Sequence, residues 1–329
     1  MKKVLSLLVM LFAVLSLAAC NTNDLEKTPV ETEKEETENK PTPEEEIELK
    51  KEIKLITPYG TPYLAIGGLI GTENLTIEAV NGPANLQTAL VSGSHDIVIA
   101  PVNLGSKLYN AGKSAYQMAA VLTMNNAYIV TKAENKLDGL SDLSGQKVLA
   151  FGQTGIPGSL LTKLYTDNSN LNINDVDFTQ ASSAAVYSLF AGGSSDAKYA
   201  LMSEPEISKL VLNDKIEVKT LDLCELLGIE VAQACVYINL NSENIEDVNK
   251  VLALISNNIK SLNENPTAYA DKVIPLDRTF EAMGKEIIVR SIPLTNIVYK
   301  NAKDSKAEIT TILSLLGVAS PKDEFYYQG

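Results

Sequence analysis

Two widely separated stretches follow the same order of features, and this repeat constrains the fold more than any other part of the chain. In residues 90–108, LVSGSHDIVIAPVNLGSKL, an apolar helix end stops at a glycine, a strand follows over 96–100, and Pro101 opens a new helix. Residues 189–210, LFAGGSSDAKYALMSEPEISKL, repeat that order with a strand at 197–202 and Pro205. Uncharged β-branched runs are typical of strands buried on both faces, and proline suits a first helical turn. The repeat predicts two α/β lobes built on one plan and facing each other.

The first twenty residues, MKKVLSLLVMLFAVLSLAAC, predict an export signal. Two lysines precede an apolar run that ends in small residues before Cys20, and this run is too short and wrongly flanked for a stable transmembrane span. Leu17-Ala18-Ala19-Cys20 resembles the lipobox of bacterial lipoproteins, in which the cysteine is diacylated and becomes the mature N-terminus. The alternative is an ordinary signal with a chance cysteine. We expect a lipid on Cys20 that anchors the chain to the extracytoplasmic face of the cell membrane.

An acidic segment over residues 21–50 follows the signal. It contains eleven acidic residues and four lysines, and so carries a net charge of −7 of the chain's −13. Such a composition cannot bury enough surface to fold, which predicts a disordered, extended tether. Because the acidity belongs mostly to this tether, it says little about a ligand. It does argue against nucleic acid, which requires a basic surface.

The remaining residues are enough for two modest lobes with cores of their own. We expect the first part of lobe 1 over 51–124, lobe 2 over 125–238 and a helical return to lobe 1 over 239–329. An apolar stripe at alternating steps of three and four residues, from Ile245 to Leu262, predicts a long helix packed on the core. The expected fold class is α/β, with a mostly parallel sheet flanked by helices in each lobe and a ligand cleft between the lobes.

Five strand-to-helix junctions carry a proline, namely Pro62, Pro83, Pro101, Pro157 and Pro205. In open α/β sheets the ligand crevice lies outside the carboxyl ends of the strands, where such helix starts point. The turn over 152–159, GQTGIPGS, also offers backbone N–H groups to an anion or polar ligand. It lacks the ending of an NTPase phosphate loop and does not match the dinucleotide fingerprint. We expect these junctions to form the ligand cleft.

The residues expected to bind the ligand are those at the junctions. Tyr59 and Tyr63 offer a flat stacking surface or, alternatively, lobe packing. Glu204 offers an acceptor for an amine or ring N–H group or, alternatively, a partner for the helix dipole. The full set is Tyr59, Thr61, Tyr63, Asn81, Pro101, Asn103, Gln153, Thr154, Gly155 and Glu204.

The arginine content narrows the ligand class. The only arginines are Arg278 and Arg290, which we expect to lie away from the junctions. A carboxylate clamp of the kind used by amino-acid binders is therefore disfavoured. A heteroaromatic or amine-bearing solute is favoured, and a small sulfonate or oxoanion held by helix N-termini is the alternative.

Other chemistries lack the residues that they require. His95 is the only histidine and is expected in a turn, so no metal site is predicted. Cys224 and Cys235 form either a disulfide or two inert buried thiols. There is no G-x-S-x-G elbow or paired-carboxylate arrangement. We therefore expect neither enzyme activity nor a cofactor.

Several motifs together resemble a known family. SGSHDIVIAP, DLSGQKVLAFGQTGIPGS, GGSSDAKYALMSEPE and QACVYINLNSENIEDVNKVL are similar to segments of type II periplasmic solute-binding proteins, of the nitrate, sulfonate, taurine and thiamine-precursor group. The resemblance runs from about residue 50 to the end, although His95 replaces a residue that is usually small. It implies a monomer that captures a small molecule between hinged lobes and delivers it to an ABC permease and its ATPase. A surface sensor or adhesin on the same fold is the alternative.

Overall fold

The structure is a computed structural model that describes residues 47–329. The export signal, Cys20 and nearly all of the acidic tether therefore lie outside the described residues, and the predictions made for them stay predictions. No helix within residues 47–329 combines the length and the apolar character that crossing a bilayer requires.

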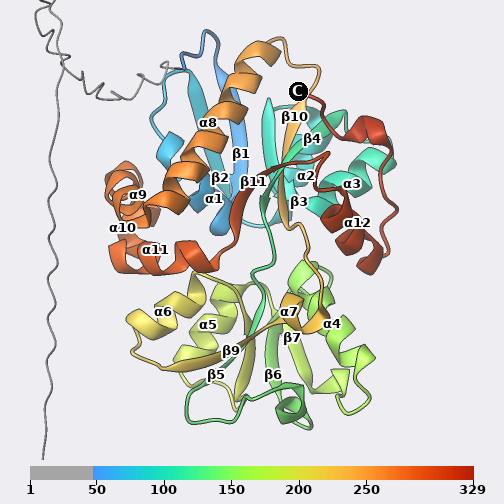
Figure 1. Ribbon diagram of the computed structural model, residues 1–329, viewed down its shortest axis with the longest axis vertical. Coiled ribbons are helices and arrows are strands. Elements are labelled where there is room, and N and C mark those ends of the chain that lie inside the picture. Colours follow the sequence, from blue (N-terminus) through green and yellow to red (C-terminus); the bar gives the residue numbers. More distant parts are fainter. Residues whose placement is uncertain (1–46) are drawn as a thin grey trace, which may run out of the picture. The chain divides into compact units, whose positions relative to one another are not determined.

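The first lobe is built on a six-stranded sheet with the order β11-β4-β10-β3-β1-β2 (Figure 1). Its three consecutive parallel strands are β1 (Ile53–Pro58), β2 (Leu75–Val80) and β3 (Ile97–Pro101), and each is followed by a helix. These helices are α1 (Thr61–Ile66), α2 (Pro83–Ser92) and α3 (Val102–Asn110). The other strands are β4 (Tyr116–Thr123), β10 (Ala234–Asn239) and β11 (Ile297–Asn301).

The second lobe holds a five-stranded sheet with the order β7-β6-β8-β5-β9. Its parallel strands β6 (Val148–Phe151), β7 (Val176–Gln180) and β8 (Tyr199–Met202) lead into α4 (Ile156–Asp167), α5 (Ser183–Ala191) and α6 (Glu206–Leu212). β5 (Tyr128–Lys132) runs antiparallel to β8 and β9 (Val218–Asp222), and α7 (Leu223–Leu227) follows β9.

The two sheets repeat one plan, as the paired stretches of sequence predict. Read from one edge, the lobe 1 sheet runs β2, β1, β3, β10 and β4, and the lobe 2 sheet runs β7, β6, β8, β5 and β9. In both sheets the first three strands are parallel, the fourth is antiparallel to them, and the fifth is parallel to them again. The antiparallel strand is the one that enters from the other lobe, β10 in lobe 1 and β5 in lobe 2. The predicted α/β class, with two lobes of sheet flanked by helices, is confirmed.

Two backbone crossings join the lobes, and they run side by side (Figure 1). The outgoing crossing lies between β4 and β5, and the returning one lies between α7 and β10. The Asn125 amide N–H donates to the Val231 carbonyl (3.1 Å), and the Gln233 N–H donates to the Thr123 carbonyl (2.9 Å). Residues 234–238, which the sequence placed at the end of lobe 2, instead belong to strand β10 of the lobe 1 sheet. The return therefore occurs before Ala234.

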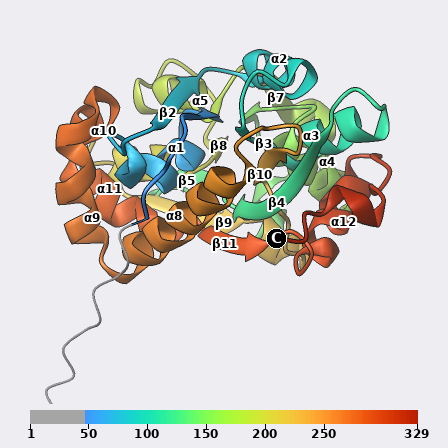
Figure 2. The same ribbon diagram turned by 90° about the horizontal axis from the view of Figure 1, so that it is seen from above.

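The C-terminal part covers one face of the lobe 1 sheet. α8 (Ile245–Glu264) lies along it with α9 (Pro266–Val273), α10 (Arg278–Met283) and α11 (Lys285–Ser291) at its end (Figures 1 and 2). The predicted stripe is buried from Val248 to Leu262, with Val248, Ile255 and Leu262 fully enclosed, whereas its first residue, Ile245, is exposed. The return is not purely helical, because β11 adds an antiparallel strand to β4 before α12 (Lys306–Leu315).

The start of the folded part is attached to lobe 1 through a carboxylate. Asp247, in the first turn of α8, accepts hydrogen bonds from the backbone N–H groups of Lys50 (3.0 Å) and Lys51 (2.8 Å). Leu49 is buried beside them. The folded chain therefore begins slightly before residue 51, where the sequence placed it, because one apolar side chain and two amides find partners on α8.

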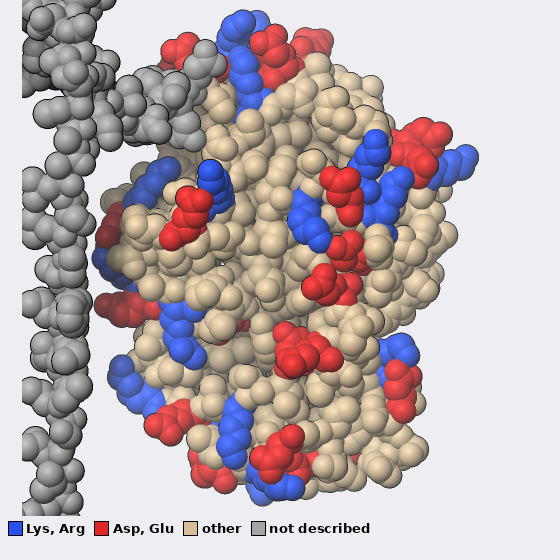
Figure 3. Space-filling model, in the orientation of Figure 1, with Lys and Arg blue, Asp and Glu red and all other residues tan. Residues whose placement is uncertain are grey.

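Charged residues of both signs are mixed on the face of the molecule in Figure 3. Acidic and basic side chains alternate there, with wide uncharged areas between them. This face offers no extended basic surface of the kind that nucleic acid requires.

Candidate functional site at the junction of the two lobes

The strand register brings the junction residues to one edge of each sheet. In lobe 1, β1 is aligned with β2 so that Pro58 is level with Val80, and the Tyr59 N–H donates to the Val80 carbonyl (3.0 Å). Asn81 directly follows β2 and Pro101 ends β3 on the same edge, since β1, β2 and β3 are parallel. In lobe 2 the parallel strands β6 and β8 place Gln153 and Glu204 beyond the corresponding edge.

The two edges are joined by a buried hydrogen-bond network of Thr61, Asn126 and Glu204, here called the interlobe network. The Thr61 hydroxyl of lobe 1 donates to the Glu204 carbonyl of lobe 2 (3.2 Å). Asn126, in the outgoing crossing, donates from Nδ2 to the Thr61 Oγ1 and to the same carbonyl, both at 3.2 Å. Its Oδ1 accepts from the Glu204 N–H at 2.8 Å. Thr61, Asn126 and Glu204 are 9%, 5% and 3% exposed. The carboxyl ends of the two sheets therefore face each other in direct contact.

The Glu204 carboxylate is turned toward its own helix. Its Oε2 accepts from the Ser208 N–H at 3.0 Å, which satisfies an amide near the start of α6. Burial raises the pKa of Glu204, while the hydrogen bonds from Ser208 and the charge of Arg290 act in the opposite direction. Of the two alternatives for Glu204, the contacts match a partner for the start of its helix and not an acceptor for a ligand. The N-cap of α6 is Pro205, and no side chain caps the helix.

Tyr59 and Tyr63 have different environments although both belong to the β1–α1 junction. Tyr63 is only 6% exposed and stacks on Phe280 of α10, with ring centroids 5.0 Å apart and planes at 19°. Burial, followed by the charge of Asp277, raises the pKa of its phenol well above the usual value. Tyr59 is 42% exposed and packs edge-on against Tyr63 at 5.4 Å. Tyr63 therefore packs the lobe, and Tyr59 alone offers a free aromatic face.

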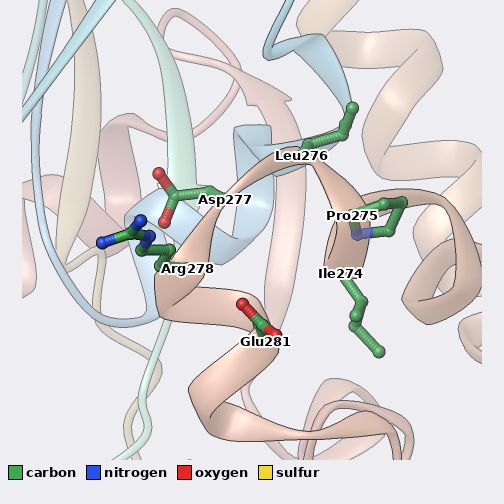
Figure 4. A pocket seen from close by; sticks show the side chains of 6 residues that line it. All are labelled: Ile274, Pro275, Leu276, Asp277, Arg278 and Glu281. Atoms are coloured by element: carbon green, nitrogen blue, oxygen red, sulfur yellow. The ribbon is translucent and has the colours of Figure 1, made fainter.

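A hollow of about 350 Å³ lies on the loop beside α10 (Figure 4). Figure 4 shows Asp277 and Arg278 pointing together to one side of the turn. Asp277 begins α10 by accepting from the Thr279 N–H at 2.7 Å. All six lining residues belong to the stretch 274–281, so this hollow is a feature of lobe 1 alone.

The Gly-rich turn of lobe 2 forms the start of α4 as expected. Gln153 and Thr154 are exposed, and Gly155 is the N-cap without a side-chain cap. Only a glycine fits at position 158, because a Cβ there would lie 2.2 Å from the Gly152 carbonyl oxygen. The turn is thereby folded tightly onto the first helical turn of α4.

The other residues predicted to bind the ligand differ in exposure and in their place at the helix starts. Asn81 is exposed before α2, and Asn103 is half-buried in the first turn of α3. Pro101 is the N-cap of α3 rather than part of its first turn. Thr61 does not cap α1, whose N-cap is Gly60, and instead provides the contact to lobe 2.

Arg290 is not away from the junctions, contrary to the expectation from sequence. It lies at the end of α11, which packs on α6, and its charge offsets part of the rise that burial causes in the pKa of Glu204. A groove of about 430 Å³ runs here between the lobes, lined by Leu212 of α6 and by Thr267, Lys285, Glu286, Val289 and Arg290 of lobe 1. The position of α11 depends on the folding of the C-terminal helices, which no local pattern reveals.

Sequence reasoning missed Asn126 and the junction between β7 and α5. Ser182 caps α5 there, with its side chain accepting from the Ala185 N–H at 3.2 Å, and Ser183 Oγ accepts from the Ser203 N–H at 3.0 Å. This junction has no proline, so the proline pattern passed over it. The repeat itself could have revealed it, since lobe 1 has three junctions and lobe 2 follows the same plan.

The cysteines and the histidine have structural positions. Cys224 and Cys235 are both buried and free, so the thiol alternative holds and the disulfide does not. His95 contacts Ser94 and Glu78 at the amino end of β3, far along the strand from the junctions. Over the described residues, no three His, Cys, Asp or Glu side chains gather in a way that could hold a metal ion.

Comparisons with known proteins match at the level of structure. No protein-family model matches the sequence, and no curated protein matches it. A solved structure of an ABC transporter from Parabacteroides distasonis is similar with a TM-score of 0.70 and 18% identity, covering 84% of this chain and 99% of that one. The periplasmic aliphatic sulphonate-binding protein SsuA from Escherichia coli has a TM-score of 0.63 and 13% identity, covering 81% and 86%.

A third similar structure is the zinc-bound ligand-binding component of an ABC-type import system from Staphylococcus aureus. Its TM-score is 0.62 at 14% identity, and the match covers 85% of this chain and 97% of that one. The chain thus has the two-lobed fold of periplasmic binding proteins. The resemblance carried by the sequence motifs to type II solute-binding proteins is confirmed at the level of this fold.

Proposed function

We propose that the chain is an extracytoplasmic solute-binding lipoprotein that captures a small molecule between its lobes and delivers it to an ABC import permease and its ATPase. The observation that carries the proposal is the meeting of the two sheet edges at the interlobe network. Strands β1–β3 and β6–β8 each end there in a helix start. A ligand held between two such edges contacts both lobes at once, which is how binding is coupled to closure.

The ligand class that these contacts favour is a small sulfonate or oxoanion. Helix starts from both lobes bring backbone N–H groups to the junction, and α4 begins at a turn whose Gln153 and Thr154 are exposed. Two of the residues expected to hold an amine or a ring are engaged elsewhere, since Tyr63 stacks on Phe280 and Glu204 bonds to Ser208. The similarity to a sulphonate-binding protein agrees with this choice.

A heteroaromatic or amine-bearing solute is the second candidate. The exposed ring of Tyr59 at the end of β1 favours it, because a flat ligand can stack there. A surface sensor or adhesin would use the same fold without transport.

The anchoring part of the proposal depends on residues outside those described. The sequence before Cys20 and the acidic composition up to residue 46 support a lipid anchor joined to the lobes by an extended tether. The attachment of Lys50 and Lys51 to Asp247 fixes the end of that tether on lobe 1. Membrane fractionation of cells expressing the chain and its Cys20→Ser variant tests the anchor, and the variant should leave the membrane fraction.

Native mass spectrometry of the purified full chain, followed by thermal-shift measurements, tests the binding role. The panel contains alkyl sulfonates, inorganic oxoanions, pyrimidines, flavins and amines. A specific solute at a hundredfold excess over its dissociation constant should stabilise the fold by about 2.7 kcal/mol. Gln153→Ala should weaken that effect, whereas Gln146→Ala, before the opposite end of β6, should not. The absence of any shift across the panel would favour the sensor or adhesin.

A further inference from the structure

We infer that the interlobe network is a closure latch, in which Asn126 positions the Thr61 hydroxyl so that the lobes close before any solute binds. The inference rests on the proposed function for its biological meaning, because it concerns the site that would hold the solute. Its geometry and its first test do not depend on a ligand.

The Thr61 hydroxyl is the only side-chain group of the network that belongs to lobe 1. It uses its donor on the Glu204 carbonyl and an acceptor position on Asn126 Nδ2. The bond to the Glu204 carbonyl joins the two lobes directly and breaks when they separate, whereas the bond with Asn126 joins lobe 1 to the outgoing crossing. Because all three residues are buried, the two bonds lie in a surrounding where hydrogen bonds are strong and unpartnered polar groups are costly.

Asn126 is held in the conformation that this contact requires. It has a positive φ of 64°, and the preceding Asn125 has a φ of 50°. Asparagine is among the few residues that adopt this left-handed region readily. Asn125 is fixed to the returning crossing by its N–H to the Val231 carbonyl and by its Oδ1, which accepts from the Val231 N–H at 3.1 Å. The two crossings thereby orient the Asn126 amide toward Thr61 and Glu204.

A second bond crosses the junction elsewhere. The Tyr128 hydroxyl of β5 donates to the Leu294 carbonyl of lobe 1 at 3.1 Å. It lies on the exposed side, where water replaces a lost partner easily. The buried network therefore contributes more to closure than this bond does.

Thr61→Val tests the latch, because valine has nearly the shape of threonine but cannot form either bond. Spin labels on cysteines at the exposed positions Ser92 of lobe 1 and Ser169 of lobe 2 report the distance between the lobes. The experiment uses the full chain with Cys20→Ser and no added solute. The native thiols of Cys224 and Cys235 are buried and stay unlabelled.

We expect one predominant short distance in the parent chain and a second, longer distance in Thr61→Val. The ratio of closed to open molecules should fall by about tenfold or more, as expected for the loss of one or two net hydrogen bonds. Thr61→Ser keeps the hydroxyl and should retain the short distance. Thr131→Val removes a buried hydroxyl that bonds to the Lys198 carbonyl within lobe 2, and it should match the parent chain.

Asn126→Gly is the second variant, because glycine accepts the positive φ and removes the amide. It should also populate the longer distance. Unchanged distances in both Thr61→Val and Asn126→Gly would overturn the latch, as would a parent chain that is already open. Failure of the binding proposal would appear separately, as a solute panel without any thermal shift.

Discussion

Gly158 ties the Gly-rich turn of lobe 2 to the start of α4, and replacing it by alanine should damage both stability and binding. The added Cβ would lie 2.2 Å from the Gly152 carbonyl oxygen, 2.6 Å from its carbon and 2.8 Å from the Gln153 Cα. All three are backbone atoms, so no side chain can rotate away. The turn must retreat by about 1 Å to reach ordinary contact distances, and such overpacking costs about 1–3 kcal/mol.

The loss should appear as a lower melting temperature. For a folded part of this size, 1 kcal/mol corresponds to about 2–4 °C, so Gly158→Ala should melt about 2–12 °C below the parent chain. Circular dichroism of the full chain measures it. Because the retreating backbone includes Gln153, the variant should also lose most of the thermal shift produced by a bound solute.

Gly139→Ala is the matched control. Gly139 has an extended φ of 175°, and a Cβ there meets no atom within 4 Å. Its change in unfolding free energy should stay within about 0.5 kcal/mol. If Gly158→Ala melts at the temperature of Gly139→Ala and binds the same solutes, the turn does not depend on the contact at Gly152 and the reasoning fails.

Three further predictions concern buried polar groups. Burial raises the pKa of Glu204, so at a pH above the ordinary carboxyl pKa the charged carboxylate destabilises the folded state. Glu204→Gln should therefore increase the free energy of unfolding in urea at pH 8. At pH 4 the variant should no longer be more stable than the parent chain. Burial also raises the pKa of Cys224 to about 12, so iodoacetamide should modify neither it nor Cys235 at pH 8 until urea unfolds the chain, as read by mass spectrometry. Asp247→Ala should free the backbone amides that it holds at the start of the folded chain, and hydrogen exchange over residues 50–53 should then accelerate several-fold while α4 exchanges as before.

The repeated order of features fixed much of the architecture from sequence alone. Buried strands such as β3 and β6 and the long helix α8 can be read locally, because their apolar patterns reflect the faces that they bury. Glycines and prolines mark the junctions, because they are selected by the local backbone conformation within a few residues. The two-lobed fold followed from finding that local order twice.

Only the tertiary structure decided which junction residues remain available to a ligand. Tyr63 and Tyr59 are alike in sequence, yet the first is covered by Phe280 from a helix more than two hundred residues later. The charge of Arg290 acts on Glu204 because the C-terminal helices fold back against α6. Asn126 carries no motif, and its importance arises from contacts with Thr61 and Glu204, which are distant in the chain. Local sequence patterns reflect backbone conformation and the burial of one face of a helix or strand. Contacts across the junction depend on how the two lobes pack together, which no local pattern specifies.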